Sequence, residues 1–306
     1  MNGLIPAEFK CQQKNEISAQ RHHITGSVSH ITNCMHDSTA DYYEVGFWLK
    51  DESFVELYEV CYRQDDETVM YSKHKLYGTT LDKHHGKGGT RPSHFSTQAM
   101  NRKIGKFYLV NTQQVNSMAT GYPFQTNTGT KYFARGHLSR FADGIFKTFK
   151  RATNYFINVA PHWQEINNGN YGAVEDKVAD LAIKLNRTFT VISGGFETLT
   201  INNAKITLGN IKVPKWIFKV VMDTEGQRKQ GIVFVVSNNA FDSFATQPPL
   251  CTDICTANRW IFPQKNNETR GLTICCSVHD FLHKIGNVLE VKDLSRNDQK
   301  NVLMNV

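Results

Sequence analysis

The segment Tyr132–Arg140, YFARGHLSR, places an arginine, a glycine and a histidine side by side after a run of aromatic residues. A neutral imidazole such as that of His137 can take a proton from water near neutral pH, and the Arg135 guanidinium can pair with phosphate oxygens. Gly136 would let the backbone turn tightly between them. Alone, the triplet favours an ordinary packed histidine over a catalytic base, so its meaning depends on residues further along the chain.

Three side chains with amide or carboxylate oxygens come after this segment. Asn158 lies in an expected strand, Asn167 precedes an expected helix, and Glu175 lies in that helix, eight residues after Asn167. Such spacing puts Asn167 and Glu175 roughly on one face if the helix starts promptly. Mg²⁺ binds through few protein oxygens and keeps water at its other positions. The set therefore indicates metal-assisted phosphodiester hydrolysis, with His137 as the general base and Arg135 on the phosphate.

The blocks ARGHLSR, NYFINVAPHW and EINNGNYGAVED resemble, in order and spacing, the signature of the DNA/RNA non-specific endonucleases, a ββα-metal family. The earlier segment FVELYEVCYRQDDETVMYSKHKLYG resembles the secreted arthropod branch of that family, which includes salivary and gut nucleases of insects. The resemblance implies a mixed α+β fold, with a central, largely antiparallel sheet flanked by helices. The ββα unit would consist of strands near residues 132 and 155 and a helix after residue 168.

The resemblance also implies a role for each site residue. His137 would be the general base that activates water, and Arg135 would contact the scissile phosphate. Asn167 would be the sole direct protein ligand of a Mg²⁺ or Mn²⁺ ion. Asn158 would position the base or the metal's water shell, and Glu175 would hold metal-bound water. The expected activity is sugar-non-specific hydrolysis of DNA and RNA.

The chain departs from the family signature at three positions. Ala134 stands where the signature begins with aspartate, His162 stands where it has glutamine, and Ala179 stands where bacterial members have an arginine one turn after the helix glutamate. The loss of that cation could weaken stabilisation of the leaving group. These departures motivate an alternative function, a nucleic-acid-binding protein on the same fold with weak or lost nuclease activity.

The charge of the chain favours a polyanionic partner. The formal net charge is +7 and the isoelectric point is near 8.9, which suits nucleic acid bound largely without regard to sequence. Trp163 and Tyr171 could stack on bases or pack in the core, and the sequence does not decide between these. The residues expected to contact nucleic acid are Arg140, Lys147, Lys150, Arg151, Trp163 and Tyr171.

The seven cysteines favour a secreted protein with two or three disulfides. No export signal is visible at the N-terminus. Since the cysteines favour secretion, we expect that a signal peptide has already been removed. The alternative is a reduced intracellular or mitochondrial protein. Cys275, His279 and His283 have a spacing seen in metal sites, but a disulfide at Cys275 and surface histidines are the favoured interpretation. No apolar run is long enough to span a membrane.

The pattern along the chain predicts an irregular lead-in over residues 1–40 and a single endonuclease domain over residues 41–306, with a boundary near residue 90 as the alternative. Strands are predicted for the aromatic and β-branched runs, and a basic exposed loop for residues 82–93. A helix is predicted after residue 168 from the apolar spacing of Tyr171, Val174, Val178 and Leu181, and another near the C-terminus over residues 276–286. The predicted strands cover residues 42–50, 54–63, 68–78, 106–112, 130–137, 154–161 (ended by Pro161), 188–195, 216–223 and 231–239.

Overall fold

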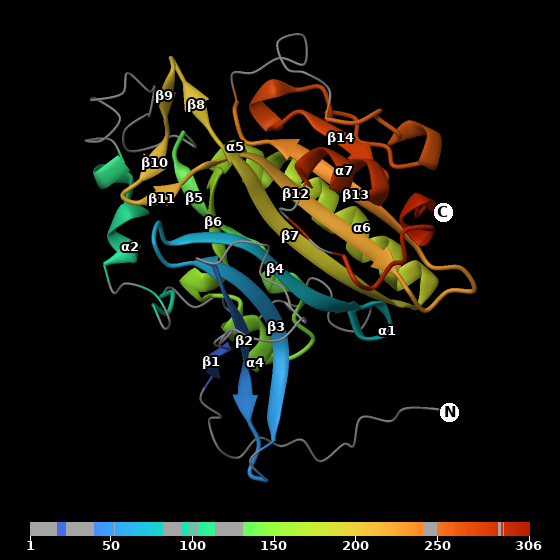
Figure 1. The fold of residues 1–306 in the computed structure, drawn as a ribbon, viewed down its shortest axis with the longest axis horizontal. Coiled ribbons are helices and arrows are strands. Elements are labelled where there is room, and N and C mark those ends of the chain that lie inside the picture. Colours follow the sequence, from blue (N-terminus) through green and yellow to red (C-terminus); the bar gives the residue numbers. More distant parts are fainter. Residues whose placement is uncertain are drawn as a thin grey trace.

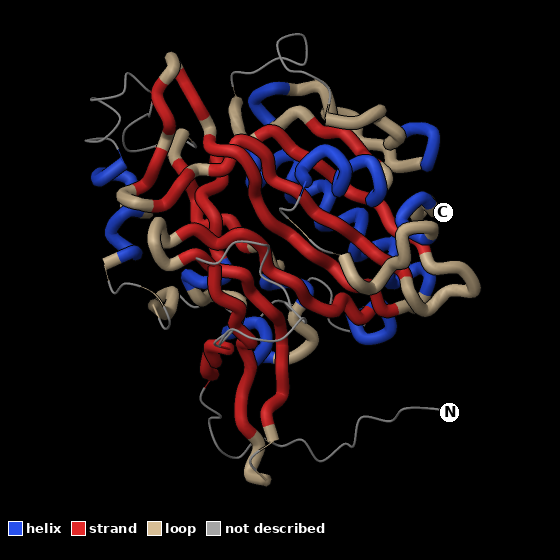
Figure 2. Tube along the Cα trace, viewed as in Figure 1, coloured by secondary structure: helices blue, strands red, loops and turns tan. Residues whose placement is uncertain are grey.

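The core of the protein is an eight-stranded sheet with the strand order β1-β2-β3-β4-β7-β12-β13-β14. All neighbouring strands in it are antiparallel. Figure 2 shows that strands dominate and that the helices lie around the sheet. The predicted α+β class is therefore confirmed. The computed structural model describes residues 17–22, 40–51, 53–81, 94–97, 100, 103–113, 131–240, 250–286, 289 and 291–306.

The first half of the sheet is the predicted antiparallel meander. Strands β2 (Ala40–Trp48), β3 (Phe54–Arg63) and β4 (Thr68–Tyr77) pair in chain order. Alternate residues point to one face, where Val45 and Tyr58 are completely buried. The β2–β3 hairpin extends well beyond the rest of the sheet (Figure 1).

The second half consists of β7 (Thr188–Thr198), β12 (Pro214–Asp223), β13 (Gln230–Ser237) and β14 (Thr273–Cys276). Their side chains are buried almost without interruption because helices and loops cover both faces, and this accounts for their continuous apolar runs. Two small ladders join β8 (Thr200–Ile201) to β9 (Ala204–Lys205) and β10 (Thr207–Leu208) to β11 (Ile211–Lys212). Other short elements around this sheet are α1 (Gly78–Leu81), η5 (Thr256–Asn258), η6 (Glu268–Arg270) and η8 (Asp298–Lys300).

The two long helices lie on opposite faces of this half of the sheet (Figure 1). Helix α6 (Gly172–Leu185) buries Val174, Val178 and Leu181 in one core. Helix α7 (Val278–Ile285) buries Phe281 in the other, where its ring packs against Phe218 at 5.3 Å between centroids. Both helices were predicted. None of the helices among the described residues has the length and hydrophobicity of a membrane span.

The ββα unit is a hairpin followed by a helix on the α6 face of the sheet. Strand β5 (Phe133–His137) pairs antiparallel with β6 (Val159–Trp163). The chain then forms α5 (Gln164–Ile166), the π turn η3 (Asn167–Tyr171) and α6. Between the two strands lie η1 (Phe141–Asp143), α4 (Lys147–Ala152) and η2 (Phe156–Asn158). The structure thus contains the unit that the family resemblance implied.

The predicted strand over residues 154–161 is wrong in its bounds. Residues 156–158 form η2, and Pro161 lies inside β6 instead of ending a strand. A proline fits there because β5 and β6 form a separate two-stranded sheet, so the outer side of β6 has no strand ladder to maintain. The Pro161 carbonyl accepts a hydrogen bond of 2.9 Å from Asn238 Nδ2.

The predicted strand over residues 106–112 is also wrong, because this region is helical. Residues Ile104–Phe107 form α2, and residues 110–113 are helical as well. The buried residues Ile104 and Tyr108 are four apart, which is helical spacing, while Leu109 is 51% exposed. Packing at this spacing outweighs the strand propensity of the aromatic and β-branched residues.

The N-terminal lead-in is not irregular throughout. Residues Ile17–His22 form β1, an edge strand that pairs with β2 from Ile17 opposite Phe47 to His22 opposite Tyr42. Backbone pairing at a sheet edge needs no apolar alternation in the sequence, so the pattern gave no signal. Residues 1–16, 23–39 and the predicted loop at 82–93 lie outside the described residues, and the division into domains stays a prediction.

Disulfides confirm the oxidised state that the cysteine count predicted. Cys251 is bonded to Cys276 and Cys255 to Cys275, so the vicinal pair joins the Cys-x3-Cys segment twice. Cys61 is disulfide-bonded as well. Because Cys275 is bonded to Cys255, the Cys275–His279–His283 spacing is not a metal site.

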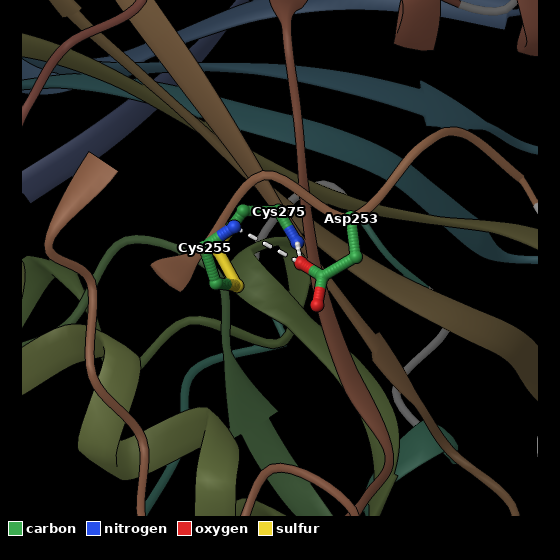
Figure 3. A group of neighbouring side chains, drawn as sticks. All are labelled: Asp253, Cys255 and Cys275. Atoms are coloured by element: carbon green, nitrogen blue, oxygen red, sulfur yellow. Dashed lines mark hydrogen bonds between the residues drawn. A yellow bond between two sulfur atoms is a disulfide. The ribbon is translucent and has the colours of Figure 1, made fainter. Parts of the chain in front are cut away.

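Asp253, Cys255 and Cys275 lie close enough to suggest a metal site, but Figure 3 shows a different arrangement. Both sulfur atoms belong to one disulfide. Asp253 Oδ1 accepts backbone N–H hydrogen bonds from Cys255 at 3.1 Å and from Cys275 at 3.0 Å. The carboxylate therefore joins two backbone segments beside the disulfide.

Loss of both C-terminal disulfides, Cys251–Cys276 and Cys255–Cys275, is expected to lower the free energy of unfolding by about 2–4 kcal/mol, because together they close one loop of 25 residues that restricts the unfolded chain. The test is urea denaturation of the variant with all four of these cysteines replaced by alanine beside the wild type. An unchanged midpoint and slope would contradict the expectation.

Candidate active site

The side chains of Arg135 and His137 extend from the same face of β5, because they are two residues apart in a strand. Phe95 lies against both. The Arg135 guanidinium carbon is 4.9 Å from the centroid of the Phe95 ring, and the His137 ring centroid is 5.4 Å from it. The aromatic ring thus holds a cation and an imidazole beside each other at a partly exposed position.

Asn154 orients the His137 ring. Its side-chain Oδ1 is 2.8 Å from His137 Nε2. Since an amide oxygen can only accept, Nε2 carries the hydrogen and Nδ1 carries the lone pair. This tautomer makes Nδ1 the basic atom of the ring. Asn154 was not among the residues predicted from the sequence, although it lies in the quoted block NYFINVAPHW.

Asn158 is completely buried and connects the segments that hold His137 and Asn154. Its Nδ2 donates to the carbonyls of Ser139 and Thr153, both at 2.9 Å, and its Oδ1 accepts the N–H of Ser139 at 2.8 Å. These bonds tie the residue two positions after His137 to the residue before Asn154. The arrangement supports a positioning role for Asn158.

His162 lies beneath the hairpin, next to Gly136. A Cβ atom on Gly136 would come within 2.1 Å of the His162 ring, so only glycine fits at this position. His162 Nδ1 is 3.2 Å from Asn167 Oδ1, and its ring meets Tyr171 edge-on at 4.9 Å between centroids. Burial lowers the pKa of His162 to about 3, so its ring is neutral.

Glu175 lies between two cations that come from distant parts of the chain. Its carboxylate is 3.4 Å from Arg140 Nε and 3.8 Å from Lys219 Nζ. Burial raises the pKa of Glu175 to about 7, against the opposing effect of Lys219 and Arg140. Lys219 is itself buried on β12 and donates a 2.6 Å hydrogen bond to Ser193 Oγ.

A buried polar network connects this cluster to the sheet below. Asp143 Oδ2 is 3.0 Å from His74 Nε2, and His74 Nδ1 is 3.0 Å from Ser139 Oγ. Ser139 Oγ is also 2.7 Å from Ser72 Oγ. The serine, histidine and aspartate resemble a hydrolytic triad in composition only, since all three are buried. The network fixes the segment after β5, which also contains Arg140.

The structure corrects three of the expected nucleic-acid contacts. Trp163 and Tyr171 are 0% and 1% exposed, so both pack in the core and neither can stack on a base. Lys150 is 9% exposed, and its stem packs against Gly144. Lys147 and Arg151 on α4 are exposed, so their contacts with nucleic acid stay a prediction.

Arg140 is engaged with carboxylates in this structure. It pairs with Asp176 as well as Glu175, and its Nη1 is 4.0 Å from Asp143 Oδ1. Nη1 is buried and makes no hydrogen bond with the described part of the chain. Arg140 therefore places a positive charge beside Glu175. This charge comes from the segment after β5, whereas Ala179, at the position of the arginine in bacterial members of the family, contributes no charge from α6. Ala134 lies directly opposite His162 across the hairpin, and Ala179 is completely buried.

Lys219, Asp143 and His74 were not predicted from the sequence either. A single lysine inside the apolar run WIFKVVMD was a usable signal, because a charge in a buried strand needs a partner. Neither Asp143 nor His74 had such a signal. Their pairing spans 69 residues of chain and depends on the packing of the ββα unit over β4.

The donor set suits a hard divalent cation. Asn167 offers an amide oxygen at a partly exposed position, and Glu175 offers a carboxylate nearby in sequence on α6. Arg140 Nη1 and Asn154 Nδ2 are buried nitrogens around the unit that make no hydrogen bond to any described residue. Both are N–H donors, so they suit the oxygen of a bound water or phosphate and not the cation itself.

Comparison with known proteins gives a consistent family match. The model of the DNA/RNA non-specific endonuclease family matches residues 36–281. A protein called salivary endonuclease from Lutzomyia longipalpis is 33% identical over 276 residues, which are 85% of this chain and 65% of that protein. Salivary protein Tsal2A from Glossina morsitans morsitans is 30% identical over 253 residues, 79% of this chain and 63% of that protein.

The match thus spans a little under two thirds of the length of these two relatives. Among solved structures, one described as the EndoG/EndoGI complex aligns with 80% of this chain and 87% of that chain, at 14% identity and a TM-score of 0.48.

Proposed function

The chain belongs to the DNA/RNA non-specific endonuclease family, and from this premise we propose that it is a divalent-metal-dependent endonuclease that hydrolyses phosphodiester bonds of DNA and RNA. The observation that carries the proposal is the arrangement of His137 and Arg135 on one strand, both against Phe95, with His137 Nε2 hydrogen-bonded to Asn154. Secretion is part of the proposal and is supported by the disulfides and by the salivary relatives.

His137 is the general base of the proposed reaction. Its Nδ1 takes a proton from the attacking water, and the Nε2 hydrogen bond to Asn154 keeps the ring in the required tautomer. Asn158 holds the two backbone segments that carry this pair. Arg135 binds a phosphate oxygen, where its charge balances the negative charge that builds up during attack.

Asn167 would hold a Mg²⁺ or Mn²⁺ ion, with Glu175 binding one or more of its waters. When bound, the cation would polarise the phosphate and stabilise the leaving oxygen. Glu175 accepts hydrogen bonds from such water most strongly when it is ionised, because both of its oxygens are then charged acceptors. Lys219 and Arg140 favour the ionised carboxylate in a buried setting that otherwise opposes it.

The pH dependence of cleavage tests this role of Glu175. Since burial raises the pKa of Glu175 to about 7, the carboxylate becomes protonated as the pH falls through 7, and the rate should fall with it. Lys219 is the charge that most lowers this pKa. As the pH falls, the Lys219→Met variant should therefore lose activity at a higher pH than the wild type. If the acidic limb of its pH–rate profile moves up by one pH unit, the rate at a pH on that limb falls about 10-fold.

The measurement is the single-turnover rate as a function of pH. Lys215→Met is the matched control, because Lys215 lies on the same strand and pairs with Glu197. An acidic limb that is unchanged in Lys219→Met would exclude control of Glu175 by Lys219.

The substrate range depends on binding through phosphates. A protein that gains affinity from phosphate contacts binds DNA and RNA with little base preference and loses affinity as salt increases. The test is incubation of supercoiled plasmid and double-stranded RNA at low salt, with Mg²⁺ and with EDTA. We expect both substrates to be cut with Mg²⁺ and neither with EDTA. Cleavage of only one, or cleavage in EDTA, would reject the proposed activity in this form.

A binding protein with weak catalysis is the second candidate, and one observation favours it. The side-chain oxygen of Asn167 is hydrogen-bonded to His162, a residue that replaces the family's glutamine. If this contact occupied the metal site, binding would persist without turnover. The plasmid experiment separates the candidates, because this one predicts binding without cleavage.

A further inference from the structure

His162 is held rigidly although no part of it reaches solvent. The ring is 0% exposed. It lies against the Gly136 backbone, where an added Cβ would come within 2.1 Å, and against the edge of Tyr171 at 4.9 Å between ring centroids. A ring confined in this way has one orientation, and in that orientation Nδ1 lies 3.2 Å from Asn167 Oδ1.

The hydrogen of this contact can be assigned. Asn167 Oδ1 can only accept, so His162 Nδ1 carries the hydrogen and donates it. Nε2 is then a lone-pair acceptor, and it is buried without a hydrogen-bond partner among the described residues. The contact with Asn167 therefore selects the tautomer with its hydrogen on Nδ1.

We infer that His162 is a positioning residue that holds the Asn167 side-chain oxygen toward a divalent cation. This inference rests on the proposed function, in which Asn167 binds the metal. An amide oxygen has two lone pairs, so it can accept the His162 N–H and still bind a cation. Without that donor, the Asn167 amide could rotate by half a turn and present its NH₂ group, which repels a cation.

Because His162 is buried, it is not expected to bind the cation directly. Nδ1 is directed at Asn167, and the ring has no exposed edge with which to bind a cation. His162 therefore acts on the metal through Asn167. Hydrogen bonds to metal-binding side chains are worth about 10–100-fold in metal affinity when they are removed.

The test measures Mn²⁺ affinity without nucleic acid, by electron paramagnetic resonance of free Mn²⁺. His162→Leu removes the donor and should weaken binding about 10–100-fold. His162→Asn places an amide N–H near the position of Nδ1 and should bind Mn²⁺ much more tightly than His162→Leu. His279→Leu, on the exposed surface of α7, is the matched control and should match the wild type. Thermal melting of each variant identifies any that fail to fold.

A fourth variant, Asn167→Leu, separates failure of this inference from failure of the proposed function. Loss of Mn²⁺ binding in Asn167→Leu with wild-type binding in His162→Leu would overturn the inference and leave the metal site intact. Undiminished binding in Asn167→Leu would instead reject Asn167 as the metal ligand, and the inference with it.

Should His162→Leu not fold, nitrogen NMR of the wild-type imidazole gives the same decision. The inference predicts that Nδ1 keeps its hydrogen and that the Nδ1 nitrogen resonance shifts when Mg²⁺ binds. Loss of that hydrogen on metal binding, or a resonance that does not respond to Mg²⁺, would overturn it.

Discussion

Replacement of His137 by alanine is expected to lower the single-turnover rate of DNA cleavage about 10²–10⁴-fold, the usual contribution of a general base. The loss is expected because the variant lacks the His137 imidazole, whose Nδ1 is the proposed base and whose Nε2 is hydrogen-bonded to Asn154. Binding to the same DNA in EDTA should remain close to that of the wild type, because Arg135 and the exposed cations of α4 are unchanged. The measurement is a rapid-mixing time course with enzyme in excess over a labelled duplex.

A second histidine variant shows whether the loss is specific. His279 lies on the exposed side of α7, on the opposite face of the sheet from the ββα unit, so His279→Ala should cut at the wild-type rate. A His137→Ala protein that melts normally and cuts within a few-fold of the wild type would remove His137 from the mechanism.

Replacement of Asn167 by alanine is expected to lower cleavage at least about 100-fold at a fixed low Mg²⁺ concentration, because the variant lacks the proposed metal-binding oxygen. Part of the loss should be recovered at high Mg²⁺, since Glu175 and its partners remain. The measurement is the cleavage rate as a function of Mg²⁺ concentration.

Asn168→Ala provides a matched control, because Asn168 is the exposed neighbour of Asn167 in the same π turn. Its Mg²⁺ dependence should be that of the wild type. Asn167→Ala also leaves the buried His162 N–H without an acceptor, which costs about 1–3 kcal/mol, so melting curves must accompany the rates. Identical Mg²⁺ dependence in the two variants would contradict the assignment of the ligand.

The sequence was sufficient to predict the ββα unit because its information is local. The blocks around His137, Asn158 and Asn167 each lie within one element or turn, and their order in the chain is the order of the elements in the structure. Helix α6 was equally predictable, since Val174, Val178 and Leu181 repeat with the helical period and are buried as that period requires.

The surroundings of Glu175 could not be predicted in the same way. Lys219 lies on β12 and Ser193 on β7, and they are directly opposite each other because of the strand register. Ser193 is also opposite Ser72 on β4. Three polar residues thus form a row across the sheet below α6, and only the pairing of strands far apart in sequence brings them there.

The nucleic-acid contacts were the least successful prediction, and the reason is burial. Their positions in the motif blocks placed Trp163 and Tyr171 beside the site, and both pack in the core there. Aromatic and basic residues close to a motif in sequence can face the core as readily as the surface. Lys150 lies on the face of α4 that packs against the meander. The spacing of the basic residues in the sequence did not show which of them would be on that face.

The measurement that tests the central claim most directly is binding and cleavage of one labelled duplex by the wild-type protein, carried out in parallel samples with Mg²⁺ and with EDTA. We predict a duplex that is bound in both conditions and is cut only with Mg²⁺. A duplex that is bound and stays intact in both would contradict the claim, and would show that a nuclease fold with this site serves in this chain as a nucleic-acid binder.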